Sequence, residues 1–142
     1  MEEIQDIKEF IPQREPIIMI DKILECEADW VETAFLIEAD NLFVEDGELT
    51  ESGLMENMAQ SAASKVGYEC KLNNEEVPLG FIGAISKVNI MFRPKVKDEL
   101  KTKVIFDKTV FNVSLINASV SVRGKLACEC QMKIVIQNKE EE

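Results

Sequence analysis

The 142-residue chain contains no histidine, and this absence limits the chemistry that it can perform. Imidazole is the side chain that titrates near neutral pH without tuning, so Ser-His-Asp and Cys-His catalysis and histidine-bound metals are excluded for this chain. Four cysteines remain, and no two of them form a Cys-x-x-Cys pair. Their spacing does not predict a zinc site, so no metal is expected. Cys128 and Cys130 are expected to be buried, reduced thiols on one face of a strand.

A carboxylate in an apolar setting is the next candidate for chemistry, and Glu56 is such a residue. Apolar and small residues recur at helical spacing around it, at Leu54, Met55, Met58, Ala59, Ala62, Ala63 and Val66. The pattern predicts one long buried helix that begins after an N-cap at Thr50 or Ser52 and has Gly67 near its end. A carboxylate on such a helix is costly to bury unless it is paired, so Glu56 is either a cap or a catalytic group. Gln60 lies one turn later on the same face and either hydrogen-bonds in the core or contacts a substrate.

The elements that must position these residues are mostly strands. Hydrophobic patterning predicts strands over residues 16–26 and 30–38 before the helix, and over 79–92, 99–111, 112–123 and 125–136 after it. Residues 1–10 are predicted as a short N-terminal helix, 39–50 and 71–77 as loops, and 137–142 as a polar tail. No strand alternates with a helix, so the prediction is one α+β domain over residues 1–142, with an antiparallel sheet wrapped around one long central helix. Such a sheet leaves an open edge, which predicts a dimer.

Charge is unevenly distributed along the chain. With 16 basic and 27 acidic residues the formal net charge is −11, so binding to nucleic acid is not expected. Residues 87–108 nevertheless hold seven basic residues against three acids, a local charge of +4. A docking surface for an acidic partner is one interpretation and a solvated strand face is the other; the candidate docking residues are Lys87, Arg93, Lys95 and Lys97. No apolar run could span a membrane and the N-terminus lacks the basic region of a signal peptide, so a cytoplasmic protein is expected.

Three segments in register resemble the hot-dog 3-hydroxyacyl-acyl-carrier-protein dehydratases of the FabZ and FabA type. Residues 11–23, IPQREPIIMIDKI, resemble the opening motif of that family, which reads like Leu-Pro-His-Arg followed by Pro and an apolar run that ends in Asp-Arg. Residues 53–63, GLMENMAQSAA, are similar to the start of its central helix. Residues 79–99, LGFIGAISKVNIMFRPKVKDE, are similar to its next strand and turn. Together the segments cover most of residues 11–100.

The resemblance implies a hot-dog fold, a dimer and a tunnel for an acyl chain carried on the phosphopantetheine of an acyl carrier protein or of coenzyme A, with no other cofactor. It also implies two catalytic positions, an acid at Glu56 and a histidine where this chain has Gln13. The loop before the helix, FVEDGELTESG, likewise lacks the family's Gly-His-Phe-Pro-Gly segment. Glutamine cannot titrate, and the loss of a positioned acid or base costs about 10²- to 10⁴-fold in rate.

The sequence therefore predicts a dehydratase-like protein that binds acyl thioesters in fatty-acid or polyketide-type lipid biosynthesis, and it leaves open whether the chain dehydrates by itself. One alternative is a hot-dog thioesterase in which Glu56 activates water while Gln13 and the N–H groups near Gly53 and Leu54 polarise the carbonyl. Another is a non-catalytic binder of acyl carrier protein, or the silent half of a heterodimer whose partner carries a histidine. The candidate substrate contacts are Gly53, Leu54, Gln60 and Phe92. Acyl chain length and the choice between carrier protein and coenzyme A stay open.

Overall fold

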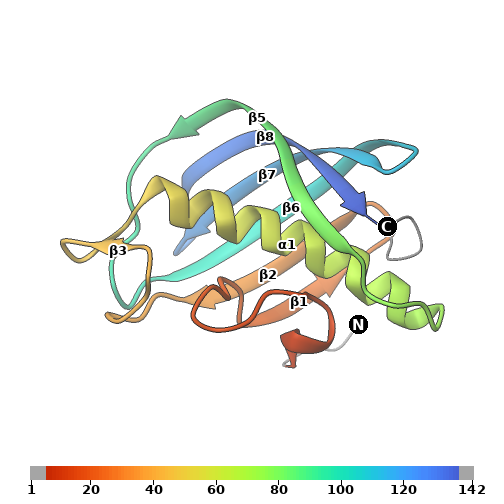
Figure 1. The fold of residues 1–142 in the computed structure, drawn as a ribbon. Coiled ribbons are helices and arrows are strands. Elements are labelled where there is room, and N and C mark those ends of the chain that lie inside the picture. The colour runs from red at the N-terminus through yellow and green to blue at the C-terminus, as the bar shows by residue number, and fades with distance from the viewer. Residues whose placement is uncertain (1–5, 138–142) are drawn as a thin grey trace.

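The computed structural model describes residues 6–137, in which one antiparallel sheet wraps around helix α1 (Glu51–Leu72) (Figure 1). The sheet has six strands in the order β1-β2-β6-β7-β8-β5. Their bounds are β1 Lys22–Cys26, β2 Trp30–Leu36, β5 Leu79–Ile90, β6 Glu99–Val110, β7 Val113–Val122 and β8 Lys125–Gln137. The predicted α+β hot-dog arrangement, a sheet around one long central helix, is confirmed. None of the helices in the described part of the chain is long and apolar enough to cross a membrane.

Helix α1 begins as predicted but ends later. Thr50 is the N-cap, and its side-chain oxygen accepts a hydrogen bond from the Gly53 N–H at 3.4 Å. The helix continues past Gly67 to Leu72, so it includes the first two residues of the predicted loop 71–77. Gly67 is therefore not a helix terminator. Its missing side chain lets Phe10 approach, because a Cβ at this position would lie 1.8 Å from the Phe10 carbonyl oxygen.

The predicted strand over residues 16–26 is wrong in its first half, since only Lys22–Cys26 pair as β1. Met19 and Ile20 are fully buried, but their segment crosses α1 and bonds to helix side chains rather than to a neighbouring strand. The predicted loop 39–50 contains a small hairpin, β3 (Val44–Glu45) and β4 (Glu48–Leu49). Of the predicted N-terminal helix the described part holds one 3-10 turn, Ile7–Glu9, and residues 1–5 lie outside the described range. Gln137 ends β8, and the rest of the predicted polar tail also lies outside that range.

Strand β5 forms an edge of the sheet, and its apolar residues are exposed. Within residues 6–137 it pairs with β8 alone. Phe81 is 50% exposed and Ile85 is 41% exposed, and other apolar side chains on or next to this strand share that exposure: Ile82, Val88, Ile90 and Met91. An apolar edge strand offers unpaired backbone groups to a further strand, so this edge fits the predicted dimer interface.

Buried hydroxyl and amide side chains join α1 to the sheet. Thr33 on β2 and Thr102 on β6 are cross-strand partners, and both are fully buried. The Thr102 hydroxyl donates to Asn57 Oδ1 at 2.6 Å, and the Thr33 hydroxyl lies 2.7 Å from that of Ser61. Buried polar groups must be paired to avoid a desolvation cost, so these bonds fix the rotation of α1 above the sheet.

The contact between Gly67 and Phe10 predicts that Gly67→Ala destabilises the protein. Alanine in a helix interior ordinarily stabilises by up to about 1 kcal/mol relative to glycine. Here its Cβ would displace the Phe10 backbone, so we expect the free energy of unfolding in urea to fall by about 2 kcal/mol. Gly80→Ala is the matched control, since its Cβ would meet Ile136 at an ordinary 3.4 Å. Equal stability of the two variants would contradict the prediction.

Asn57 and Thr102 provide a second prediction about stability. Asn57→Ala leaves the Thr102 hydroxyl and the Met19 carbonyl without their partner, so we expect a loss of about 2 kcal/mol in urea denaturation. Thr102→Val removes the hydroxyl that donates to Asn57, and the double variant should lose less than the sum of the singles, by about 1 kcal/mol. Additive losses would show that the two side chains do not interact.

Candidate functional site

A pocket of about 210 Å³ lies between α1, the segment that precedes β1, and the β5–β8 pair. Two of the predicted functional residues, Glu56 and Gln13, lie in it together. The remaining lining residues are small or apolar: Ala59, Ala63, Gly80, Phe81, Ile82 and Ile134. The pocket therefore combines one carboxylate and one amide with apolar walls.

The carboxylate of Glu56 is held by Gln60, one turn further along α1. Gln60 Nε2 donates to Glu56 Oε1 at 3.0 Å and to the Ile17 carbonyl oxygen at 2.8 Å. Gln60 Oε1 accepts the Met19 N–H at 2.6 Å. Since Gln60 is fully buried and lies outside the pocket lining, its amide positions Glu56 and the 17–19 segment rather than facing a ligand.

Gln13 belongs to the irregular segment that crosses the helix, and it lines the pocket together with residues of α1, β5 and β8. The segment is anchored by Ile11, which is 2% exposed, and by Arg14, whose Nη1 donates to the carbonyl oxygens of Ile11 and Gln13 at 2.8 and 2.7 Å. Gln13 Oε1 is buried, yet it has no hydrogen-bond partner within the described residues. A buried acceptor without a partner is unusual, and a donor on a bound ligand would satisfy it.

Three predicted substrate contacts lie away from this pocket. Leu54 is fully buried in the core, and its N–H donates to the Thr50 carbonyl oxygen at 3.1 Å. Gly53 packs tightly, since a Cβ there would lie 2.6 Å from the Leu49 side chain, and its N–H is taken by the Thr50 cap. Phe92 packs against the core, with Lys125 Nζ 5.7 Å from its ring centre. Sequence patterning placed Gly53 and Leu54 near the helix start, but it could not show which side of the helix faces the pocket that holds Glu56.

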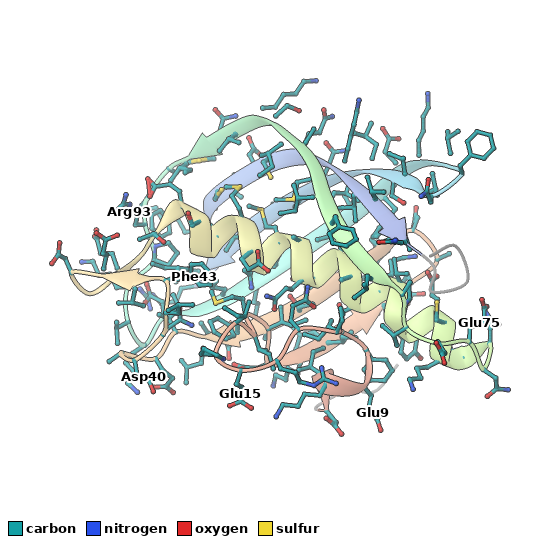
Figure 2. The ribbon with its side chains drawn as sticks, in the orientation of Figure 1. Glu9, Glu15, Asp40, Phe43, Glu75 and Arg93 are labelled. Carbon is teal, nitrogen blue, oxygen red and sulfur yellow. The ribbon has the colours of Figure 1, made fainter. Side chains whose placement is uncertain are left out.

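The four candidate docking residues divide into one on β5 and three in the loop that follows it. Lys87 lies at a register shift of β5 and has a positive φ of 53°. In the loop, Arg93 Nη2 donates to Glu51 Oε2 at 2.8 Å, and Lys97 Nζ lies 2.6 Å from Glu38 Oε2. Figure 2 shows Arg93 beside the N-terminal turn of α1. Two of the predicted cations are therefore partly neutralised by acids of the same chain.

The cysteines are structural thiols in this fold. Cys128 and Cys130 are buried, and burial raises the pKa of Cys128 to about 12 and that of Cys130 to about 11. Thiols with such pKa values stay protonated and unreactive at neutral pH. Residues 6–137 hold no cluster of acidic or cysteine side chains that could bind a metal.

Sequence reasoning missed the apolar walls of the pocket. Helical spacing predicts Ala59 and Ala63 only as part of a buried helix, whereas they border the pocket together with Gly80 of β5. The sequence does contain a signal for these walls. Two small residues lie four positions apart on the helix, and a glycine lies at the start of the next strand, which together leave space between the two elements.

The family model of the ApeP-like proteins, described as ApeP dehydratase, matches residues 5–141. Among curated proteins, the 3-hydroxyacyl-acyl-carrier-protein dehydratase FabZ of Staphylococcus saprophyticus is 31% identical over 136 residues, which cover 94% of each chain. FabZ of Clostridium botulinum is 30% identical over 139 residues, which cover 94% of this chain and 95% of that protein.

Solved structures with the same fold include proteins of more than one activity. A chain of the dehydratase heterocomplex ApeI:P from Xenorhabdus doucetiae superimposes with a TM-score of 0.89 at 17% identity, covering 95% of this chain and 93% of that one. A hypothetical thioesterase with coenzyme A from Streptococcus pneumoniae gives a TM-score of 0.64 at 13% identity, over 82% and 84% of the two chains. At these identities the likeness concerns the fold alone. The match to the family model and the extent of the FabZ similarity show the family as well. This chain therefore belongs to the ApeP-like dehydratase family, within the FabZ-like hot-dog proteins.

Proposed function

We propose that this chain binds 3-hydroxyacyl thioesters as one subunit of a hot-dog dimer in the cytoplasm, and that it contributes Glu56 to dehydration while a histidine-bearing partner supplies the imidazole. The observation that carries the proposal is the pocket in which Glu56 and Gln13 meet apolar walls, in a chain without histidine. The pathway class is fatty-acid or polyketide-type lipid synthesis, as for the FabZ relatives.

Dehydration of a 3-hydroxyacyl thioester requires two proton transfers. A base removes a proton from the carbon next to the thioester carbonyl, and an acid protonates the leaving hydroxyl group. Glu56 is the one titratable residue that lines the described pocket, and it is oriented by Gln60. Gln13 Oε1 is a spare acceptor, so it would receive the hydrogen of the substrate's 3-hydroxyl group. The second proton transfer then falls to a group from the partner.

The place for that partner is the free edge of β5. Its residues Phe81 and Ile82 both line the pocket and are exposed, so a strand added to β5 would come close to Glu56. The ApeI:P relative is a heterocomplex of dehydratases, which supports a heterodimer over a homodimer. A homodimer of this chain would hold no imidazole.

The substrate would be carried by an acyl carrier protein, docked on Lys87, Arg93, Lys95 and Lys97. The ion pairs of Arg93 with Glu51 and of Lys97 with Glu38 hold the loop after β5 in place near the start of α1. An acidic carrier would exchange contacts with these exposed pairs, which individually contribute little to stability. Coenzyme A thioesters would enter by the same phosphopantetheine arm.

A thioesterase is the second candidate, and the convergence of Glu56 with Gln13 favours it. Glu56 would activate a water molecule, and the Gln13 amide would donate to the thioester carbonyl. This route needs no partner and no imidazole. Hydrolysis releases a free thiol, whereas dehydration releases water and keeps the thioester, so the products distinguish the two proposals.

Mass spectrometry of a 3-hydroxydecanoyl thioester on acyl carrier protein would test the proposed function. We expect loss of water only when a histidine-bearing hot-dog partner is present, and a fall of at least about 100-fold with Glu56→Gln, which keeps the shape but cannot transfer a proton. Glu75→Gln is the control, because Glu75 is an exposed residue just beyond the same helix, outside both the pocket and the proposed docking residues. Release of free thiol by the chain alone, abolished by Glu56→Gln, would establish the thioesterase instead. Water loss that is unaffected by Glu56→Gln would contradict both.

Gln13 provides a separate prediction about recognition of the substrate's hydroxyl group. Gln13→Ala should weaken binding of a 3-hydroxyacyl thioester by about fivefold to tenfold, the effect of one lost hydrogen bond. Binding of the saturated acyl thioester, which has no hydroxyl group, should change by less than half as much. Isothermal titration of both ligands measures the difference, and equal losses for the two would assign Gln13 to the pocket wall only.

A further inference from the structure

A second cavity, of about 420 Å³, lies at the C-terminal half of α1. It opens between the helix and the ends of β6, β7 and β8, and Val66 and Ile136 are among its lining residues. Figure 1 shows the end of β8 beside the start of β5, above this part of the helix. The cavity therefore lies further along α1 than the Glu56 pocket.

Ile136 and Val66 line the second cavity and are neighbours, on β8 and α1, of residues that line the Glu56 pocket. On β8, Ile134 lines the Glu56 pocket and Ile136, two residues later on the same face, lines the second cavity. On α1, Ala63 lines the first and Val66, one turn later, lines the second. Gly80 pairs with Ile136 across the sheet, and a Cβ on Gly80 would lie 3.4 Å from Ile136 Cδ1. The Ile136 side chain thus lies over the end of the Glu56 pocket.

The surroundings differ on the two sides of this boundary. Towards Glu56 the walls are alanine, glycine and isoleucine. Beyond the boundary lies Lys65, which is 4% exposed, bonds Glu69 Oε1 at 2.9 Å and has its ammonium 4.8 Å from the Phe106 ring centre. An alkyl chain is stabilised by the first set of walls, and it would have to desolvate charged groups to enter the second cavity.

We infer that Ile136, together with Val66, forms the end wall of the acyl-chain pocket and sets the longest acyl chain that the protein accepts. This inference rests on the proposed binding of acyl thioesters. The pocket has a finite volume of about 210 Å³, so a wall at its end limits the length of alkyl chain that it can bury.

The experiment measures binding of hexanoyl-, octanoyl- and dodecanoyl-coenzyme A to the wild-type chain and to two variants. Ile136→Ala opens the wall from the sheet side and Val66→Ala opens it from the helix side. We expect each variant to bind dodecanoyl-coenzyme A at least about fivefold more tightly than the wild type does, since removal of a wall side chain enlarges the apolar end of the Glu56 pocket, where further methylene groups become buried without reaching the charged cavity. Hexanoyl-coenzyme A, which ends before the wall, should bind within about twofold of the wild type.

Val135→Ala is the matched control, because Val135 is the next residue on β8 and points to the other face of the sheet. It should leave the order of affinities unchanged. If the wild type binds acyl-coenzyme A but neither folded variant changes its preference for chain length, the wall lies elsewhere and the inference is overturned while the proposed function stands. If the wild type binds none of the three probes, the proposed function fails, and the inference fails with it. Two variants on different elements keep the test decisive should one of them not fold.

Discussion

The structure depends on hydrogen bonds from side chains of α1 to the backbone of a segment that belongs to no strand. Residues 17–19 cross the helix, and at the fully buried Met19 water cannot bond the peptide groups. Asn57 and Gln60 replace the missing strand neighbour: Gln60 Oε1 accepts the Met19 N–H, and Asn57 Nδ2 donates to the Met19 carbonyl oxygen at 2.7 Å. Because Asn57 also accepts from Thr102, one pair of amides joins three layers, namely the crossing segment, the helix and the sheet. This explains why the central helix carries polar groups on a buried face.

The same hydrogen bonds position the candidate catalytic residues, Glu56 and Gln13. Glu56 directly precedes Asn57 and is bonded by Gln60, so its carboxylate is oriented by the group that also holds residues 17–19. Gln13 lies a few residues before that anchor and is carried over the helix to the same pocket. The site therefore does not depend on a flexible loop. Its geometry follows from the depth at which the helix is buried and from the path of the segment that crosses it.

The architecture was largely accessible from sequence, whereas the details near the site were not. Period-two alternation over residues 125–136 and helical spacing after Thr50 predicted the sheet and the helix, because both patterns arise from burial of one face. The run Ile-Ile-Met-Ile at residues 17–20 was predicted as strand because a short, continuous apolar run has no periodicity that separates a strand from a crossing segment. The predicted roles of Gly53 and Leu54 depended on which side of α1 faces the pocket. That rotation is set by hydroxyl contacts such as that of Thr102, which no local pattern reveals.

The exposed edge of β5 has a consequence for how a cell handles this chain. An apolar strand with unpaired peptide groups is a template for indiscriminate association, and Phe81 and Ile85 lie open on it. A copy made without its partner presents that edge to chaperones, proteases and other nascent chains, whereas an assembled copy conceals it. Under the proposed heterodimer, the surviving amount of the protein would follow the supply of the subunit that covers the strand, and synthesis of the two subunits in equal numbers would protect both.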